Sequence, residues 1–321
     1  MIKNKSILIT GAAGFIGGHL FENLIKGNNY IIVIDNFNKY YNGKEEQFEK
    51  ITKDYEISKD YFLIKGDLLD KSVYNEINCE VDIIFHLAAQ AGVRYSIEHA
   101  SEVTNNNIVG TVNILEFALR NNVKKVVYSS SSSVYGNPIY TPLDEEHPKN
   151  PISPYAVSKL VGEIYADFYF REYYLPITSV RFYTVYGPRG RPDMAIRKFY
   201  NLILQDREIT IYGDGGQLRD FTYISDIING LILAAENNNS VGEIFNLGIG
   251  NPISVNDLVD KMYNIANKSK RIRYTERQKG DVDVTYSNTE KAKKILNYYP
   301  STNIDDGLRK TFEWHKSHIS I

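Results

Sequence analysis

The segment SPYAVSK, residues 153–159, places a tyrosine one helical turn before a lysine. If the segment is helical, Tyr155 and Lys159 lie on the same face. A free phenol titrates near roughly pH 10, and a neighbouring ammonium lowers that pKa by stabilising the phenolate. The pair could therefore supply a general base, although a surface helix with a solvated lysine has the same spacing.

A glycine pattern follows the first apolar run of the chain. The run SILIT (6–10) leads into GAAGFIG (11–17), which opens a helical pattern over 15–26. Gly11, Gly14 and Gly17 allow a tight turn and a close approach of the backbone to a pyrophosphate at the helix N-terminus. The spacing differs from the usual G-x-G-x-x-G fingerprint, and tight packing of strand on helix is the structural alternative.

Two carboxylates stand at the ends of the next two apolar runs. Asp35 closes IIVID (31–35), where it could accept hydrogen bonds from an adenosine ribose and would repel a 2′-phosphate. This position favours NAD over NADP as the cofactor. Asp67, after the run that begins at residue 61, either lies near the adenine or caps a helix.

These residues need a sheet to position them, and the chain alternates apolar strand-like runs with helical patterns. The expected strands cover 6–10, 31–35, 61–67, 81–89, 123–136 and 177–187. Such alternation predicts an α/β fold with a Rossmann-type doubly wound parallel sheet and a smaller C-terminal substrate-binding lobe. We expect an NAD-binding domain over 1–187 and a mainly nucleotide-sugar-binding lobe over 188–321, with segments near 220–250 returning to the first domain. The polar insertion around 38–60 is expected to be mobile.

Composition narrows the function classes. The 321 residues carry a net charge of -2, which gives no indication of nucleic-acid binding. Cys79 is the only cysteine, so no intramolecular disulfide can form, and no metal site is predicted. Without a signal peptide or a long apolar run, the sequence predicts a cytoplasmic protein with no membrane partner.

Five motifs in order carry a family resemblance. The glycine pattern, HLAA (86–89), NNIVGT (106–111), the serine-rich strand end and Y-x-x-x-K resemble the extended short-chain dehydrogenase/reductases. The similarity continues through RDFTYISD (219–226) and FNLGIG (245–250). The segments AAQAGVRYSIE (88–98) and VYGPRGRPDMA (185–195) are most similar to nucleotide-sugar epimerases, and among these to UDP-glucuronate 4-epimerases.

The resemblance implies roles for individual residues. Tyr155 matches the catalytic base, Lys159 the lysine that bonds the nicotinamide ribose and tunes the phenol, and Ser131 the hydroxyl that bonds the reacting sugar oxygen. Asn107 matches an asparagine that contacts the cofactor, unless it caps the following helix. Arg219 matches the residue facing the substrate diphosphate, unless it forms a surface ion pair with Asp220. Further implied cofactor contacts are Phe15, Ile16, Asn36, Leu68, Leu87, Ala88, Ala89 and Ser129; implied substrate contacts are Ser132, Ser133 and Thr184.

The serines after Ser131 bear on the reaction. Relatives that eliminate water carry an Asp-Glu pair where this chain has Ser132 and Ser133, and relatives that decarboxylate UDP-glucuronate usually have a glutamate at the second position. The implied reaction is therefore NAD-dependent 4-epimerisation of UDP-glucuronate to UDP-galacturonate through a 4-keto sugar, with NAD retained. The alternatives are a 4-epimerase of UDP-glucose or UDP-N-acetylglucosamine, a UDP-glucuronate decarboxylase, and a catalytically silent NAD-sensing protein. The family often pairs through a helix bundle, which implies a homodimer.

Arg191 is the candidate for recognising the sugar acid. A guanidinium can form two parallel hydrogen bonds to a carboxylate, such as the one at C6 of the sugar. The structural alternative is that Arg191 pairs with Asp193 and only shapes its loop.

Overall fold

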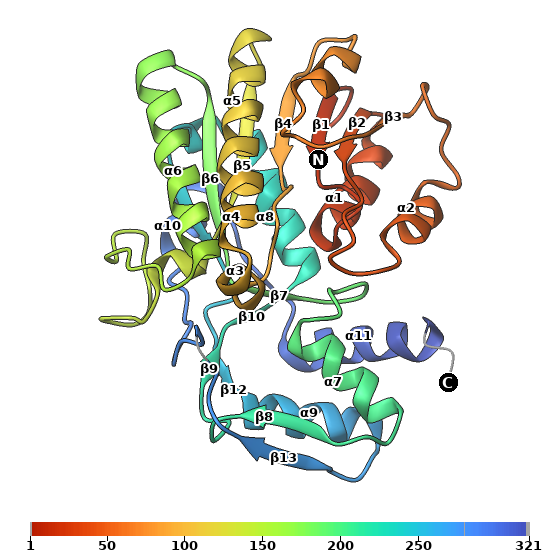
Figure 1. Ribbon diagram of the computed structural model, residues 1–321, viewed down its shortest axis with the longest axis vertical. Coiled ribbons are helices and arrows are strands. Elements are labelled where there is room, and N and C mark those ends of the chain that lie inside the picture. The colour runs from red at the N-terminus through yellow and green to blue at the C-terminus, as the bar shows by residue number, and fades with distance from the viewer. Residues whose placement is uncertain (1, 279, 319–321) are drawn as a thin grey trace.

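The core of the molecule is a seven-stranded parallel sheet. The computed structural model describes residues 2–278 and 280–318, and Figure 1 shows the sheet between two groups of helices. The strands are β1 (Ser6–Thr10), β2 (Tyr30–Asp35), β3 (Tyr61–Lys65), β4 (Ile83–His86), β5 (Lys125–Ser131), β6 (Ile177–Phe182) and β11 (Ile244–Leu247). Their order is β11-β6-β5-β4-β1-β2-β3, so successive strands are added on one side of β1 up to β3 and on its other side from β4 onward. The predicted Rossmann-type sheet is confirmed, and its switch point is where such folds bind ligands.

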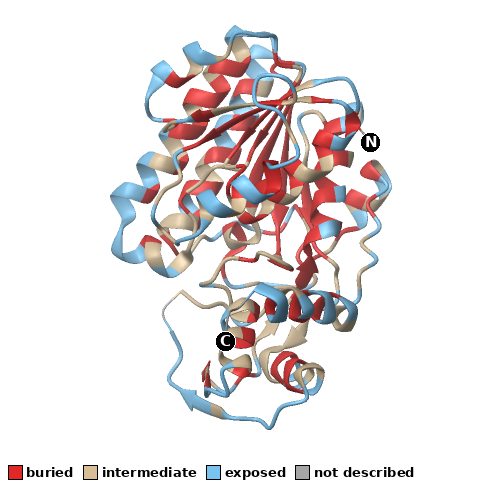
Figure 2. Ribbon diagram, turned by 90° about the vertical axis from the view of Figure 1, so that its right-hand side faces the viewer, coloured by how far each residue is buried: buried red, intermediate tan, exposed pale blue. Residues whose placement is uncertain are grey.

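Most strand residues are buried because both faces of the sheet are covered. Leu8 and Ile32 belong to one buried cluster, whereas their neighbours Ile9 and Val33 belong to the other. This alternation is the two-residue period of a strand, with each face packed on its own helical layer. Figure 2 shows the buried sheet between helices whose outer residues are exposed.

One face carries helices from distant parts of the sequence. α1 (Phe15–Leu24) packs against α8 (Ile224–Glu236). α2 (Lys44–Thr52), within the insertion that was expected to be mobile, buries Phe48 and Ile51 near α1. The insertion is therefore partly helical and anchored to the core.

The opposite face carries α5 (Gly110–Arg120) and α6 (Pro154–Tyr173). α5 continues from α4 (Ala100–Thr104) through a π-helical segment over Asn105–Val109. The short helix α3 (Val93–Glu98) contacts α6. α6 thereby runs behind the end of β5, the strand that it contacts.

Past the sheet, the chain builds a smaller lobe, seen at the bottom of Figure 1. It contains β8 (Ile209–Tyr212) with β13 (Ile272–Thr275), β9 (Leu218–Arg219) with β12 (Ile253–Ser254), and the helices α7 (Ala195–Leu204), α9 (Val255–Ala266) and α11 (Ile304–His318). β7 (Thr184–Tyr186) pairs with β10 (Phe221–Tyr223) between lobe and sheet, and α10 (Glu290–Leu296) packs on α8 and β11. The division into domains at residue 187 stays a prediction. Among the described residues, no helix is long and apolar enough to cross a membrane.

Candidate active site

One cavity of about 960 Å³ brings the predicted residues together. It is lined by the glycine loop, by the ends of β2, β4 and β5, by the start of α6 and by parts of the lobe. The predicted residues that line it are Gly11, Gly14, Phe15, Ile16, Gly17, Asp35, Asn36, Asp67, Leu68, Leu87, Ala88, Ala89, Ser129, Ser131, Ser132, Ser133, Tyr155, Lys159, Thr184, Arg191 and Arg219. Asn107 is the one predicted site residue outside this lining.

The glycine loop has the geometry of a backbone cradle. Gly11 has a φ of +77°, and a Cβ there would lie 2.9 Å from the backbone nitrogen of Ala88. A Cβ on Gly17 would lie 2.1 Å from the carbonyl oxygen of Gly11. α1 begins directly after Gly14 with no side-chain cap, so its first amides have no side-chain acceptor there. An uncapped helix start of this kind fits the pyrophosphate of a dinucleotide.

The carboxylate of Asp35 is held by the loop that it supports. It accepts hydrogen bonds from the amides of Ala13, at 2.9 Å, and Phe37, at 2.8 Å. Burial nevertheless raises its pKa. Each oxygen accepts only one of these bonds, which leaves capacity for a ribose hydroxyl.

Asp67 does not cap the helix that follows it. It accepts from the amide of Leu69 at 2.9 Å and from the side chain of Asn36 at 2.8 Å. The cap of the 3₁₀ helix Lys71–Glu76 is Asp70. The pair Asn36 and Asp67 thus joins the ends of β2 and β3 at the cavity wall.

Tyr155 and Lys159 do share one face of a helix. α6 begins at Pro154, and the hydroxyl of Ser153 accepts the amide of Ala156 at 3.2 Å. The Nζ of Lys159 donates to the carbonyl oxygen of Ser129 at 2.7 Å. The helix start and the strand end are therefore fixed to each other beside the cavity.

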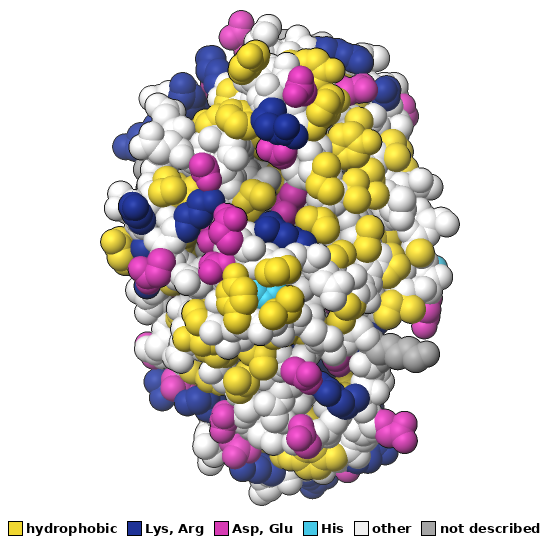
Figure 3. Space-filling model, turned by 90° about the vertical axis from the view of Figure 1, so that its left-hand side faces the viewer, with side chains coloured by type: hydrophobic (Ala, Val, Ile, Leu, Met, Phe, Trp, Pro, Cys, Tyr) yellow, Lys and Arg dark blue, Asp and Glu magenta, His cyan; other side chains and the backbone are white. Residues whose placement is uncertain are grey.

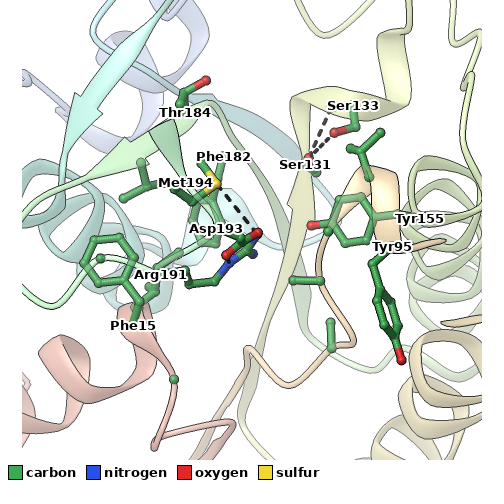
Figure 4. A pocket seen from close by; sticks show the side chains of 18 of the residues that line it. Phe15, Tyr95, Ser131, Ser133, Tyr155, Phe182, Thr184, Arg191, Asp193 and Met194 are labelled. Atoms are coloured by element: carbon green, nitrogen blue, oxygen red, sulfur yellow. Dashed lines mark hydrogen bonds and ion pairs between the residues drawn. The ribbon is translucent and has the colours of Figure 1, made fainter. Parts of the chain in front are cut away.

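The hydroxyl of Ser131 belongs to a turn at the end of β5. It accepts from the amide of Ser133 at 3.1 Å, and the two serine hydroxyls are 2.9 Å apart. Figure 4 shows the phenol of Tyr155 and the guanidinium of Arg191 extending toward each other from opposite sides of the cavity.

Burial is the main influence on the pKa values of both Tyr155 and Lys159. Burial lowers the pKa of Lys159 to about 7, against the attraction of Glu163. Burial also raises the pKa of Tyr155, and the opposing influences are Arg191 and a hydrogen bond with Ser131. The tuning of the phenol by Lys159 stays a prediction, and in this structure the cation that opposes the effect of burial on Tyr155 is Arg191.

Arg191 is bonded to Asp193 while it faces the cavity. Its Nε donates to Oδ1 at 3.0 Å and its Nη2 to Oδ2 at 2.7 Å. The predicted structural alternative is thus realised, and it coexists with a place in the cavity lining.

Arg219 and Asp220 do not pair with each other, because their side chains have different partners. Arg219 lines the cavity, and its Nη1 donates to the carbonyl oxygens of Leu218, at 2.9 Å, and Asp283, at 3.3 Å. Asp220 is fully buried and accepts backbone amides, including that of Gly250 at 3.0 Å. The surface ion pair of Arg219 with Asp220 is therefore wrong as an alternative.

Asn107 supports the site from behind. It lies within the π-helical segment, so it caps no helix. Its Oδ1 accepts the amide of Gln90 at 2.7 Å, and its Nδ2 donates to the hydroxyl of Ser158 at 2.9 Å. The side-chain amide of Asn107 thus bridges the loop after β4 and α6, and its contact with the cofactor stays a prediction.

Sequence reasoning missed a buried ion pair next to Lys159. Glu163, one turn further along α6, accepts from Nε of Arg181 at 2.8 Å and from its Nη2 at 2.7 Å. The hydroxyl of Ser130 donates to the same carboxylate. No local pattern reveals this pair, because its members come from a helix and a strand 18 residues apart.

Tyr40 was also missed. Its hydroxyl donates to Oδ2 of Asp193 at 3.2 Å, and it lines the cavity. The available signal was the pair of adjacent tyrosines in the polar segment just after Asp35.

Comparison with known proteins identifies the family. The profile of the family described as GDP-mannose 4,6 dehydratase matches residues 8–311. The chain belongs to this family. Its predicted resemblance to the extended short-chain dehydrogenase/reductases is confirmed.

Several proteins similar to this chain are nucleotide-sugar epimerases. A UDP-glucuronate 4-epimerase of Thermodesulfobacterium geofontis is 38% identical, over 98% of this chain and 97% of the relative. The structure of the UDP-glucuronic acid 4-epimerase of Bacillus cereus, in complex with UDP-glucuronic acid and NAD, has a TM-score of 0.91 and 34% identity, covering 97% of this chain and 99% of that one. A UDP-N-acetylglucosamine 4-epimerase of Methanobrevibacter ruminantium, in complex with UDP-N-acetylmuramic acid, has a TM-score of 0.91 and 31% identity, covering 99% and 100%.

Proposed function

We propose that this protein is an isomerase that converts UDP-glucuronate to UDP-galacturonate at C4, with NAD as its cofactor and a transient 4-keto sugar. The observation that carries the proposal is the meeting of Tyr155, Ser131 and Arg191 in the cavity that also contains the glycine loop. An acid-base group and a carboxylate-binding group thereby face the same space. The relatives named UDP-glucuronate 4-epimerase support this assignment.

The residues of the cavity fit NAD. Gly11, Gly14 and the first turn of α1 would hold the pyrophosphate, Asp35 the adenosine ribose, and Lys159 the nicotinamide ribose. Bound NAD supplies the reversible acceptor of the hydride from C4. Asp35 supports NAD over NADP because a buried carboxylate would repel a 2′-phosphate.

Tyr155 would handle the proton of the reaction. Its phenolate takes the proton of the C4 hydroxyl as the ketone forms, and the phenol returns that proton after the sugar has turned its other face. Burial raises the pKa of Tyr155, and Arg191 and Ser131 both oppose that rise, which favours the phenolate that a general base requires. The hydroxyl of Ser131 would hold the same sugar oxygen.

Holding the sugar acid would be the second task of the site. A 4-keto uronate is a β-keto acid, which loses carbon dioxide when the bond from C5 to the carboxylate aligns with the ketone π-system. Arg191, with Thr184 also in the lining, would bind the carboxylate and keep that bond out of alignment. Arg219 would face the diphosphate. Ser132 and Ser133 bring hydroxyls where elimination or decarboxylation would use carboxyl groups.

A neutral UDP-sugar is the second candidate substrate. The ion pair between Arg191 and Asp193 favours it, because a carboxylate already neutralises the guanidinium. The similarity to a UDP-N-acetylglucosamine 4-epimerase points the same way.

One experiment separates these activities. The purified protein is incubated with UDP-glucuronate, UDP-glucose or UDP-N-acetylglucosamine, and the products are identified by NMR. We expect UDP-galacturonate to form fastest. Preferred turnover of a neutral sugar would select the second candidate, and a UDP-pentose as the main product would identify a decarboxylase.

Exposed apolar side chains along α6 support a homodimer. Val157, Ile164 and Phe168 are 44%, 59% and 40% exposed, and their spacing of seven and four places them on one helix face. Figure 3 shows apolar side chains gathered on the side of the molecule where α6 lies. Light scattering is expected to give a dimer for the wild type and a monomer for Ile164→Glu. The cytoplasmic location stays a prediction.

A further inference from the structure

Asp193 contacts Arg191 directly, and Tyr40 contacts Asp193. Asp193 binds both Nε and Nη2 of the guanidinium. A side-on pair of this kind fixes the plane of an arginine, because two parallel bonds allow little rotation. Nη1 forms no part of this pair and is the remaining donor for a ligand.

Asp193 is itself held by a side chain from a distant part of the sequence. The hydroxyl of Tyr40, in the loop after β2, donates to Oδ2 of Asp193 at 3.2 Å. The guanidinium carbon of Arg191 lies 6.0 Å from the centre of the Tyr40 ring. A chain of contacts therefore runs from the loop that follows Asp35 to the arginine at the sugar end.

The position of Tyr40 is built into the fold. Its ring packs edge-on against Tyr95 with 5.0 Å between the centres. Gly92 has a φ of +108°, and a Cβ there would lie 2.4 Å from the hydroxyl of Tyr40. Glycine at position 92, in the turn before α3, thus leaves the space that the phenol of Tyr40 occupies.

We propose that Tyr40 and Asp193 are positioning residues that set the specificity of the site for an acidic sugar, by holding Arg191 with Nη1 directed to the substrate carboxylate. The inference rests on the proposed function. Asp193 also partly neutralises the positive charge of Arg191, so it weakens the attraction of the guanidinium for an incoming anion. Orientation is gained at the expense of affinity.

This division predicts different effects on kcat and KM. Asp193→Asn keeps the shape and removes the charge. On UDP-glucuronate, kcat should fall about tenfold or more because Arg191 loses its fixed orientation, while KM should stay or decrease because the guanidinium is no longer neutralised. On UDP-glucose, any change should be smaller, because only the effect of Arg191 on Tyr155 applies there.

Tyr40→Phe tests the hydrogen bond from Tyr40 to Asp193 with a smaller change. Loss of one hydrogen bond to a carboxylate should lower kcat/KM for UDP-glucuronate about threefold to tenfold and leave UDP-glucose unaffected. Tyr95→Phe is the matched control, because the hydroxyl of Tyr95 donates to Glu102 at 2.8 Å and points away from Arg191 in Figure 4. That variant should retain the wild-type preference.

The outcomes distinguish this inference from the proposed function. If the wild type does not turn over UDP-glucuronate, the proposed function fails. The inference is then tested by calorimetry, which measures how much more tightly UDP-glucuronate binds than UDP-glucose. This difference is compared between wild type and Tyr40→Phe. If Tyr40→Phe alters both substrates equally, or Asp193→Asn raises KM with kcat unchanged, the positioning role is overturned. In either case, the circular-dichroism spectra of both variants must match that of the wild type, which shows that the variants are folded.

Discussion

The ammonium of Lys159 donates a hydrogen bond of 2.7 Å to the carbonyl oxygen of Ser129. This bond joins α6 to β5 at the point where both present catalytic candidates. Lys159 is only 4% exposed, and burial lowers its pKa from 10.5 to about 7. The site therefore contains a cation that the fold accommodates at a cost.

That cost predicts a pH dependence of stability. Between about pH 7 and pH 10 the unfolded chain keeps the proton of Lys159 while the folded chain releases it, so the unfolded state binds more protons. The contribution of Lys159 to stability consequently rises with pH in this window and is least favourable below it. The free energy of unfolding of wild type minus that of Lys159→Met should increase from pH 7 to pH 9, by at most about 1.4 kcal/mol per pH unit. Urea denaturation at three pH values measures it, and a flat or falling difference would contradict the buried cation.

Tyr155→Phe should abolish most of the activity without unfolding the protein. The change removes only the phenolic oxygen, and loss of a general base costs about 10²–10⁴-fold in rate. Turnover of UDP-glucuronate is the measurement. Tyr140→Phe is the control, because this tyrosine is 43% exposed and bonded to Asp144; its rate should match that of the wild type. Near-normal turnover by Tyr155→Phe would remove the phenol from the mechanism.

Asp35→Asn should weaken the discrimination between NAD and NADP. The wild type is expected to bind NAD more tightly because a carboxylate repels a 2′-phosphate and accepts bonds from a free ribose. Hydrogen bonds to a charged group contribute about 1.5–3 kcal/mol, which corresponds to roughly tenfold to a hundredfold in affinity. Calorimetry with both cofactors tests this, and equal wild-type affinities would show that Asp35 has only its bonds to Ala13 and Phe37 to make.

The buried ion pair behind the site predicts a large loss of stability. Arg181 and Glu163 have side chains that are 1% and 3% exposed. Glu163→Gln would leave Arg181 buried without a charged partner, which costs about 3–5 kcal/mol of unfolding free energy. Asp167→Asn breaks an exposed pair with Arg171 on the same helix and should cost about 1 kcal/mol or less. Similar losses for the two variants would mean that the buried pair relaxes.

The sheet could be predicted because its signals are local. β1 begins and ends where the apolar run 6–10 does, and the glycine spacing of 11–17 marks the turn that follows. The spacing of Tyr155 and Lys159 likewise required only a helix. For such residues the physical cause lies within a few positions of the chain.

Side-chain partners could not be predicted in the same way. Asn107 bonds to Gln90 and Ser158, and Tyr40 bonds to Asp193, across separations of 17, 51 and 153 residues. These contacts depend on how the elements are placed in space. The sequence therefore indicates which residues meet in the cavity, whereas the charge distribution around Tyr155 emerges only from the folded chain.

Arg191→Ala should reverse the preference of the enzyme for an acidic sugar. The guanidinium is the cation that lowers the pKa of Tyr155, so its loss removes both a carboxylate ligand and an aid to the base. Loss of the charge-assisted bond from Nη1, at about 1.5–3 kcal/mol, predicts a fall of about tenfold to a hundredfold in kcat/KM for UDP-glucuronate. The fall on UDP-glucose should be smaller, because only the effect on Tyr155 applies there.

Arg189→Ala is the matched control for Arg191→Ala. Arg189 lies on the same loop but is bonded to Glu22, so its loss should change the turnover of both substrates alike. NMR of the residual products adds a second measurement, since a freed carboxylate can align with the ketone and UDP-pentose should then accumulate. An unchanged preference for UDP-glucuronate in Arg191→Ala would show that another group recognises the acid.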